Sequence, residues 1–263
     1  MAGKLTKKEL AKELGLPRST LYYKRKLPSK DLILVERIRE TLHLHPSYGY
    51  RRVATHLKIN HKRALRVMKE FGVKPYRRRV HKPQRKTTDL LAGYPNLIKN
   101  CFPSSPGDIW ISDFTYIPYR GRFIYLAVVE DLFSRKVVGS HISKSHDTPL
   151  VSAALFDALT YHKAPKIIHS DQGVEYRSKA YTELAKRFSI SISMSKKASP
   201  WENGYQESFF SQFKVDLGDP HRFETLPELV EYIQLRVYIY NHYRIHTSLK
   251  MSPIDYLRVM QIA

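Results

Sequence analysis

The chain of 263 residues is long enough for one large hydrophobic core or two modest domains. Its hydrophobic content of 42% and aromatic content of 12% favour a folded protein, and no apolar run reaches the roughly 18–20 residues that cross a bilayer. The single cysteine, Cys101, excludes an intramolecular disulfide and a zinc site built on several cysteines. We therefore expect a cytoplasmic protein with no membrane partner.

The formal net charge of +21 is unevenly distributed along the chain. Residues 1–90 contain 25 Lys and Arg against 7 Asp and Glu, whereas residues 91–263 contain 20 against 17. Positive charge that is segregated in this way is typical of nucleic-acid binding, while a generally basic, solvated surface is the alternative. We interpret the N-terminal third as the part that binds nucleic acid.

Residues 1–27 have the pattern of a helix-turn-helix. Two short helices are expected within Thr6–Lys26, with Gly15 ending the first and Pro17 in the first turn of the second. The second helix is basic and aromatic, as in a recognition helix that enters the major groove, and an ordinary helical hairpin is the alternative. The candidate DNA contacts here are Arg18, Lys24 and Arg25.

Residues 28–73 predict a second helical DNA-binding module. Apolar residues at helical spacing indicate helices over Leu32–Leu44, Ser47–Leu57 and Asn60–Gly72, with Asn60 as an N-cap. The expected core residues are Val53, Leu57, Leu65, Met68 and Phe71. The candidate DNA contacts are Arg51, Arg52, Lys62 and Arg63.

Residues 74–106 predict a basic linker, because the segment Lys74–Asp89 combines prolines and dense charge with little apolar content. Such a linker follows a phosphate backbone or serves only as a solvated tether. The candidate DNA contacts are Arg77, Arg78 and Arg79.

Residues 107–263 predict a different kind of domain. Three segments rich in β-forming residues, Ile109–Tyr119, Gly121–Phe133 and Arg135–Ser143, indicate an antiparallel meander. Helices and short strands then alternate, which predicts an α/β fold with a mixed five-stranded sheet and helices on both faces. These later segments are a helix over Thr148–Lys163 capped by Thr148, a strand in Lys166–Gly173, a helix over Ser178–Ile190, a strand over Ile190–Ser195, a helix from Ser199 and a last helix over Leu226–Tyr243.

Two aspartates occupy positions that suggest chemistry. Asp113 lies inside the first predicted strand, where an acidic residue is costly unless it is paired or binds a metal ion. Asp171 ends a short buried strand, and functional residues of open α/β sheets cluster at such carboxyl ends. Together they are candidates for a carboxylate site.

The helix that begins at Ser199 contains two glutamates. Ser199 and Glu202 have the spacing of a capping box, so we interpret Glu202 as structural. Glu207 lies a turn deeper and shares a helix face with Phe210, so a buried Phe210 would point the Glu207 carboxylate toward the sheet. A solvent-facing glutamate is the alternative when Glu207 is considered alone.

The spacing of these carboxylates resembles a known pattern. Asp113 and Asp171 are separated by 57 residues, and Asp171 and Glu207 by 35, which resembles the aspartate–aspartate–35–glutamate core of retroviral integrases and bacterial insertion-sequence transposases. Several stretches in the same order resemble the second-frame transposase of the insertion-sequence-three family, over roughly residues 47–257. These stretches are "YGYRRV", "DFTYI", "YLAVVEDLFSRKVVG", "HSDQGVEY", "SPWENGYQESFFSQFKVDL" and "YNHYRIHTSLKMSP".

The resemblance implies a ribonuclease H-like catalytic core and a DNA transposase that cleaves and joins strands at the ends of an insertion sequence. It implies that Asp113, Asp171 and Glu207 bind two magnesium ions, which manganese can replace, during in-line phosphoryl transfer. It also places Lys214 near DNA phosphate. The implied partners are double-stranded DNA of the transposon ends and target, further copies of the chain on DNA, and a first-frame product, in the nucleoid of a bacterial cytoplasm.

Some alternatives stay open at this point. A non-catalytic DNA-binding remnant or regulator derived from a transposase is the alternative to an active enzyme. His169 is interpreted as a buried strand histidine satisfied by backbone rather than as a catalytic base, and Asn203 as a site neighbour or a core amide. The residues of the C-terminal signature, interpreted as packing or DNA contacts, are Tyr240, Asn241, Arg244 and His246.

Overall fold

The computed structural model describes residues 6–17, 27–76, 93–99, 101–195 and 204–260. The first helix, α1 (Lys7–Glu13), begins at Thr6, whose hydroxyl accepts the N–H of Glu9 while the Glu9 carboxylate accepts the N–H of Thr6. The backbone leaves this helix at Gly15, which has a φ of 63°. The first predicted helix is therefore present. The second helix of the predicted helix-turn-helix, with Arg18, Lys24 and Arg25, lies outside the described residues.

Three helices form a separate small core, which we call the helical module (residues 27–76). They are α3 (Leu27–Leu44), α4 (Tyr50–His56) and α5 (His61–Glu70). The side chain of Asn60 accepts the N–H of Lys62 at 2.8 Å, so the predicted N-cap is confirmed. The residues buried between the helices are Leu34, Val35, Ile38, Tyr48, Val53, Val67 and Met68.

One expected core residue of the helical module is replaced by its neighbours. Val53 and Met68 are buried as predicted, and Leu57 and Phe71 pack at the margin of this core. Leu65 is only half-buried. The inward face of α5 consists of Ala64, Val67 and Met68, whose helical spacing leaves Leu65 beside that face.

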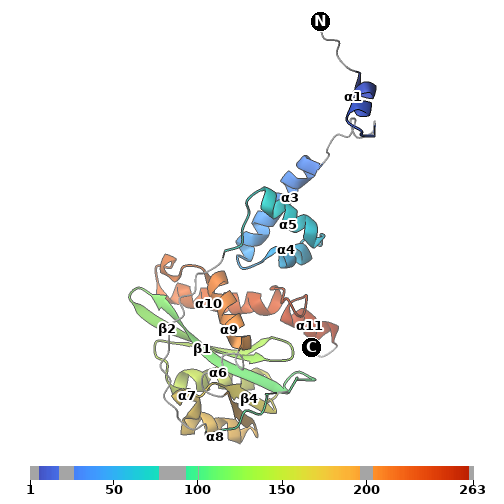
Figure 1. The fold of residues 1–263 in the computed structure, drawn as a ribbon. Helices are drawn as coiled ribbons and strands as arrows, with labels where there is room; N and C mark the ends of the chain where they lie inside the picture. Colours follow the sequence, from blue (N-terminus) through green and yellow to red (C-terminus); the bar gives the residue numbers. More distant parts are fainter. Residues whose placement is uncertain (1–5, 18–26, 77–92, 100, 196–203, 261–263) are drawn as a thin grey trace.

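A five-stranded mixed sheet forms the centre of the larger domain (Figure 1). Its strand order is β3-β2-β1-β4-β5, with β1, β2 and β3 antiparallel as predicted and β4 and β5 parallel to β1. β4 pairs with β1 only as far as Ile111 and His169, so the rest of this edge of β1 is left uncovered by β4. The strands are β1 (Ile109–Tyr119), β2 (Arg122–Asp131), β3 (Val137–Ser143), β4 (Ile167–Ser170) and β5 (Ser191–Met194).

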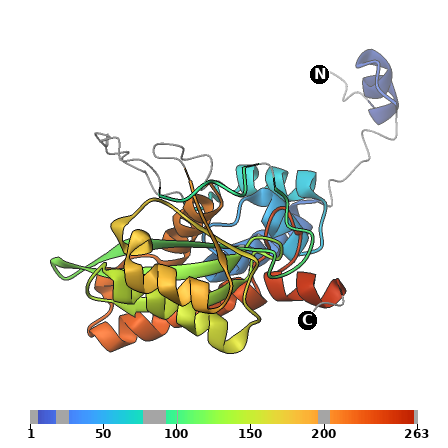
Figure 2. The same ribbon diagram turned by 90° about the horizontal axis from the view of Figure 1, so that it is seen from below.

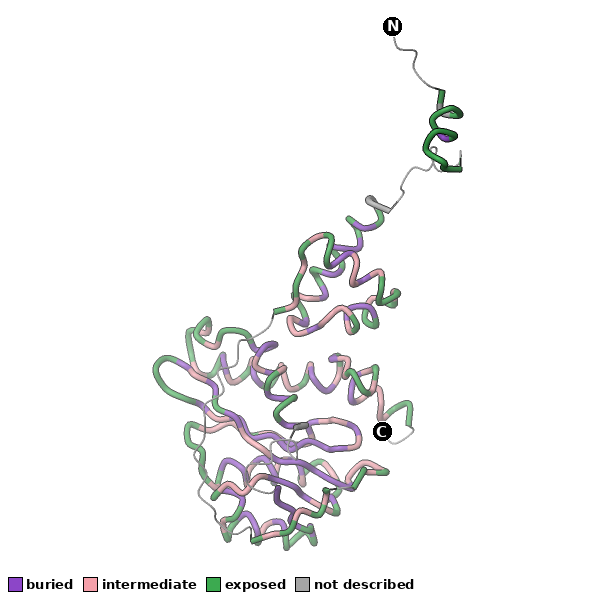
Figure 3. Tube along the Cα trace, viewed as in Figure 1, coloured by how far each residue is buried: buried purple, intermediate pink, exposed green. Residues whose placement is uncertain are grey.

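Helices cover both faces of the sheet, as expected (Figures 1 and 2). One face packs against α6 (Thr148–Tyr161), α7 (Val174–Arg177) and α8 (Lys179–Arg187), and the other packs against α9 (Gly204–Leu217) and α10 (Leu226–His242). A short 3₁₀ turn, η2 (Pro220–Arg222), joins α9 to α10, and α11 (Pro253–Val259) follows α10. Figure 3 shows the buried residues concentrated along the sheet and its covering helices. None of the described helices is both long and apolar enough to cross a membrane.

The N-cap of α6 is one residue earlier than predicted. Asp147, not Thr148, is the N-cap of α6, and its carboxylate accepts the N–H of Leu150 at 3.3 Å. Thr148 is instead the first helical residue, because the extended backbone needed at an N-cap falls at Asp147.

Strand β3 approaches α6 closely at Gly139. A Cβ on Gly139 would lie 2.6 Å from the backbone nitrogen of Ala158, so only glycine permits this approach.

Candidate active site

Asp113 and Asp171 lie where β1 and β4 separate. Asp113 lies two residues after Ile111, the last β1 residue that pairs with β4. Its Oδ1 accepts the N–H of Phe114 at 2.8 Å. Asp171 directly follows β4, and its Oδ1 accepts the N–H of Gly173 at 2.9 Å. Both carboxylates are half-buried. Because β1 and β4 are parallel neighbours with Ile111 opposite His169, and each aspartate lies two residues further along the chain, the two aspartates come side by side where β4 ends.

Tyr176 is a buried residue near both aspartates. Its ring is fully buried and its hydroxyl accepts a hydrogen bond from Ser112 at 3.3 Å. Burial raises the pKa of this phenol well above its usual value, and the negative charges of Asp113 and Asp171 raise it further.

The structure corrects the predicted orientation of Glu207. The side chain of Glu207 is exposed, whereas the neighbouring Gln206 is fully buried and donates its amide Nε2 to the carbonyl of Ile111 at 3.0 Å. Residues 206, 209, 210 and 213 share the helix face that packs on the sheet, and three of them are phenylalanines. This face fixes the rotation of α9, so Gln206 rather than Glu207 points at the sheet.

Helix α9 contacts β1 at two further points besides its packing on the sheet. Gln206 contacts β1 at Ile111, and Lys214, two turns later, places its ammonium 4.4 Å from the ring centre of Tyr116. Glu207 lies in the first turn of α9, next to Gln206. The hydrogen bond from Gln206 to Ile111 fixes this turn to β1 two residues before Asp113.

The side chains around Asp113 and Asp171 have the chemistry of a metal site but not its full geometry. Asp113, Asp171 and Glu207 offer the hard oxygen ligands that Mg²⁺ prefers. Within the described ranges, however, no three His, Cys, Asp or Glu side chains converge on one point. The structure thus brings the two aspartates together and keeps Glu207 on the adjacent helix. The predicted cap at Ser199 and Glu202, with Asn203, lies outside the described residues.

A further carboxylate beside Asp171 was missed in the sequence. A Cβ on Gly173 would lie 2.9 Å from Oε2 of Glu175 and 3.0 Å from Oδ1 of Asp171, so both oxygens face the space that this glycine leaves open. The other oxygen of Glu175 contacts Nδ1 of His146 at 3.2 Å. The stretch "HSDQGVEY" contains this glutamate, but only the turn at Gly173 brings it back to Asp171.

His169 is a structural residue of the sheet. It is fully buried on β4, and its Nδ1 lies 2.9 Å from the hydroxyl of Ser193 on β5. The buried strand position is as predicted, and the Ser193 hydroxyl is one partner of the ring. This position joins β4 to β5 and supports Asp171 from within the strand.

Arg52, a predicted DNA contact, has a docking role in the structure. Its guanidinium donates hydrogen bonds to the carbonyl of Ser47 and to Oε1 of Gln212 on α9, both at 2.8 Å. Burial, together with the nearby charge of Arg244, lowers the pKa of Arg52 to about 10. This arginine connects the helical module to α9 of the α/β domain.

The other predicted DNA contacts divide into three groups. Arg63 lies 3.7 Å from the buried carboxylate of Asp31, inside the helical module. Arg51 and Lys62 are exposed on α4 and α5, where DNA can reach them. The segment with Arg77, Arg78 and Arg79 lies outside the described residues.

A buried ion pair completes the contact between the helical module and α9. Nε of Arg244 lies 2.9 Å from the carboxylate of Asp216, and the guanidinium also donates to Oγ of Ser47 at 2.9 Å and to Oε1 of Gln212. The N–H of Ile245 donates to the hydroxyl of Tyr48 at 2.7 Å. The helical module is therefore held against the helix that carries Glu207.

The C-terminal signature serves packing, one of its two predicted roles. Tyr240 is buried in the core under α9. The side-chain amide of Asn241 accepts the N–H of Val137 and donates to the carbonyl of the same residue, both at 2.9 Å. His246 is held by the hydroxyl of Ser248 at 2.9 Å, and burial lowers the pKa of His246 to about 4.

Comparisons with known proteins agree with this architecture. Two families, each described as an integrase core domain, match residues 103–200 and 189–253. The chain is 32% identical over 262 residues to the InsK protein of insertion sequence element IS150 from Escherichia coli strain K12, which covers 94% of this chain and 92% of that protein. The chain belongs to the insertion-sequence transposases with an integrase core domain. It is also 34% identical over 238 residues to the transposase for insertion sequence element IS904 from Lactococcus lactis, covering 85% of this chain and 93% of that one.

The fold of this transposase also matches a solved viral assembly. The simian T-cell lymphotropic virus intasome, in complex with the PP2A regulatory subunit B56 gamma, contains a chain with a TM-score of 0.51 and 19% identity. The match covers 82% of the transposase and 72% of that chain. The ribonuclease H-like fold expected from the sequence is thereby confirmed. Since the family is shown, the protein is a DNA transposase of the polynucleotidyl transferase class, and the non-catalytic alternative has no support.

Proposed function

We propose that this transposase cleaves and joins DNA strands at the ends of its insertion sequence, with Asp113, Asp171 and Glu207 as the ligands of two divalent ions. The observation that carries the proposal is the pair of aspartates at the fork of β1 and β4, each two residues beyond the paired residues Ile111 and His169. Glu207 lies on α9 next to Gln206, which donates a hydrogen bond to the carbonyl of Ile111, two residues before Asp113. The ion is Mg²⁺, and Mn²⁺ can replace it.

A few residues around the carboxylates have defined roles in this proposal. The bound ions supply the charge that activates the attacking oxygen and stabilises the leaving one during in-line displacement. Gly173 keeps the loop after β4 tight enough for Asp171 to face the site. Gln206 anchors the first turn of α9, and Lys214 holds a DNA phosphate from two turns further along that helix.

We also propose the partners of the reaction. Double-stranded DNA of the transposon ends and of the target contacts the exposed Arg51 and Lys62 of the helical module, and the predicted contacts outside the described residues. Pairing of two transposon ends calls for more than one copy of the chain on DNA, with a first-frame product as a further candidate partner. This places the protein in the nucleoid of the bacterial cytoplasm.

The test is strand cleavage and joining on a labelled duplex that carries the end of the element, with Mg²⁺ or Mn²⁺. Glu207→Gln should lower the cleavage rate by more than about 100-fold, because the loss of a metal ligand exceeds the 10–100-fold cost of changing the residues around it. Binding of the end duplex should be unchanged.

A matched control is Glu183→Gln, which changes an exposed helix glutamate on α8 that only pairs with Lys179 at 3.7 Å. This variant should cleave as the wild type does. If Glu207→Gln retains the activity of Glu183→Gln, Glu207 is not a metal ligand. If the wild type binds the end and never cleaves it, even with a first-frame product added, the proposed reaction is wrong.

A further inference from the structure

Two large aromatic side chains stand exposed on the hairpin of β1 and β2. Tyr116 is 50% exposed and Phe123 is 51% exposed, and their rings meet edge to face with centroids 5.4 Å apart. The opposite face of the same hairpin is buried through Ile117 and Ile124. The hairpin is therefore firmly seated on the protein, while this aromatic pair remains in contact with water at a cost in free energy.

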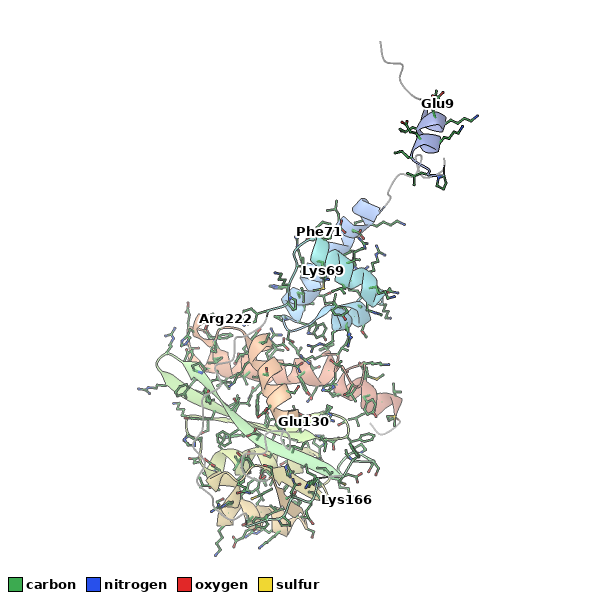
Figure 4. All side chains as sticks on the ribbon, viewed as in Figure 1. Glu9, Lys69, Phe71, Glu130, Lys166 and Arg222 are labelled. Carbon is green, nitrogen blue, oxygen red and sulfur yellow. The ribbon has the colours of Figure 1, made fainter. Side chains whose placement is uncertain are left out.

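The surroundings of this pair are positively charged. Residues 116–125 contain Arg120 and Arg122 and no acidic residue. The ammonium of Lys214 lies 4.4 Å from the ring centre of Tyr116. Figure 4 shows Arg222 at the same end of the molecule, where the hairpin projects, and its guanidinium lies over the ring of Phe223 at 4.8 Å. Aromatic faces beside cations are what a DNA strand with an unstacked base requires.

The pair also lies close to the candidate metal ligands. Tyr116 follows Asp113 by three residues on β1, which corresponds to about 10 Å along a strand. A DNA strand covers that distance in about three nucleotides. Alternation places Asp113 and Tyr116 on opposite faces of β1, but Lys214 reaches the Tyr116 ring from α9, around the edge that β4 leaves uncovered. One strand can therefore pass both positions along this edge.

We propose that Tyr116 and Phe123, flanked by Lys214 and Arg122, form a stacking site for an unpaired base of the DNA strand, about three nucleotides from the phosphate that is cut. We call these four residues the hairpin patch. The inference rests on the proposed function, because it takes the site of cleavage to be at Asp113. Stacking of a base on an aromatic side chain contributes about 1–3 kcal/mol, and the cations hold the phosphates on either side.

The experiment measures binding and base stacking, not catalysis. End duplexes carry the fluorescent base 2-aminopurine at single positions around the cleavage site, and their fluorescence is recorded with wild-type protein, Tyr116→Leu and Phe123→Leu. Matched controls are Tyr161→Leu and Phe156→Leu, which remove exposed aromatic side chains (76% and 59% exposed) from α6.

Wild-type protein should change the fluorescence at one or two positions near the cleavage site. Tyr116→Leu and Phe123→Leu should abolish that change and weaken end binding by about 5- to 150-fold, the equivalent of losing one stacked base. The two controls should stay within about twofold of the wild type. Because all four side chains are exposed, the variants should fold normally, which their melting temperatures will show.

Two outcomes would overturn the inference. One is that Tyr116→Leu matches Tyr161→Leu in both affinity and fluorescence. The other is that Tyr116→Leu changes the oligomeric state measured by light scattering and leaves the fluorescence change intact, since the hairpin patch would then contact a second copy of the chain. Failure of cleavage by the wild type, with the fluorescence change present, would contradict the proposed reaction and not the stacking site.

Discussion

Replacing Asp216 with asparagine should weaken the contact between the helical module and the catalytic domain. The Asp216 carboxylate accepts hydrogen bonds from Nε of Arg244 at 2.9 Å and from the N–H of Ser47 at 3.2 Å. Asparagine keeps the size of the side chain and removes its charge. The guanidinium of Arg244 would then stay buried without its counter-ion.

The expected magnitude follows from burial. The side chains of Arg244 and Asp216 are only 4% and 9% exposed, so water cannot replace the lost partner. Removing one member of a buried ion pair costs about 3–5 kcal/mol. Arg244 keeps its hydrogen bonds to Ser47 and Gln212, so we expect the lower end, about 3 kcal/mol in the free energy of unfolding.

The assay is urea unfolding followed by circular dichroism, with Asp255→Asn as the control. Asp255 pairs with Arg258 at 3.3 Å, but these side chains are 50% and 66% exposed, so that change should cost less than about 1 kcal/mol. If Asp216→Asn is no more destabilising than Asp255→Asn, the ion pair does not hold the two parts together and the argument from burial is wrong.

Three further changes test other parts of the structure. Gly139→Ala would place a Cβ 2.6 Å from the nitrogen of Ala158 and should lower the free energy of unfolding in urea by about 1–3 kcal/mol. Gly93→Ala is the control, because a Cβ at Gly93 has nothing within 4 Å and should not lower the stability. Equal stability of the two variants would contradict the close approach. Gln206→Met keeps the volume and removes the hydrogen bond to β1, so cleavage should fall about 10–100-fold with end binding intact, and an unchanged cleavage rate would show that this anchor is dispensable. Burial raises the pKa of Glu130 to about 8 in the folded protein. The native state then binds a proton that the unfolded state has released, and stability should fall as the pH rises from about 5 to 8. Glu130→Gln should reduce that slope in urea titrations, and an identical slope in both proteins would rule out Glu130 as its source.

Much of the fold could be predicted because its signals are local. The alternation of β-forming residues gave the bounds of β1 to the residue, and the N-cap at Asn60 needed only its side chain and the next turn. The helices α7 and α11, of four and seven residues, were not predicted, although α1 and α4, also of seven residues, were. The N-cap of α6 was misplaced by one residue because Asp147 and Thr148 are both good caps.

The candidate site was harder to predict where its geometry depends on distant contacts. The spacing of Asp113, Asp171 and Glu207 identified the three residues, but the rotation of α9 is set by three phenylalanines that pack on the sheet. A helical pattern around Phe210 alone could not show that Gln206 takes the inward position. The roles of these carboxylates as metal ligands stay a prediction.

Charge alone was also insufficient to separate DNA contacts from docking residues. Arg52 has the sequence surroundings of a phosphate contact, and its partner Gln212 lies 160 positions further along the chain. Nothing local signals such a partner. Arg51 and Lys62 therefore remain predicted DNA contacts, while Arg52 has a visible structural role.

The contact between Ser47 and Arg244 joins residues 197 positions apart, which has a consequence for biosynthesis. At about 5–20 residues per second, a ribosome makes Arg244 about 10–40 s after Ser47. During that interval the helices of residues 27–76 can fold, but the surface that receives them does not yet exist. A chain that is released early would present its basic N-terminal part without the catalytic domain held against it. Such a fragment would carry the predicted DNA contacts Arg51 and Lys62 without Asp113, Asp171 and Glu207, so early release would separate the predicted DNA contacts from the candidate site.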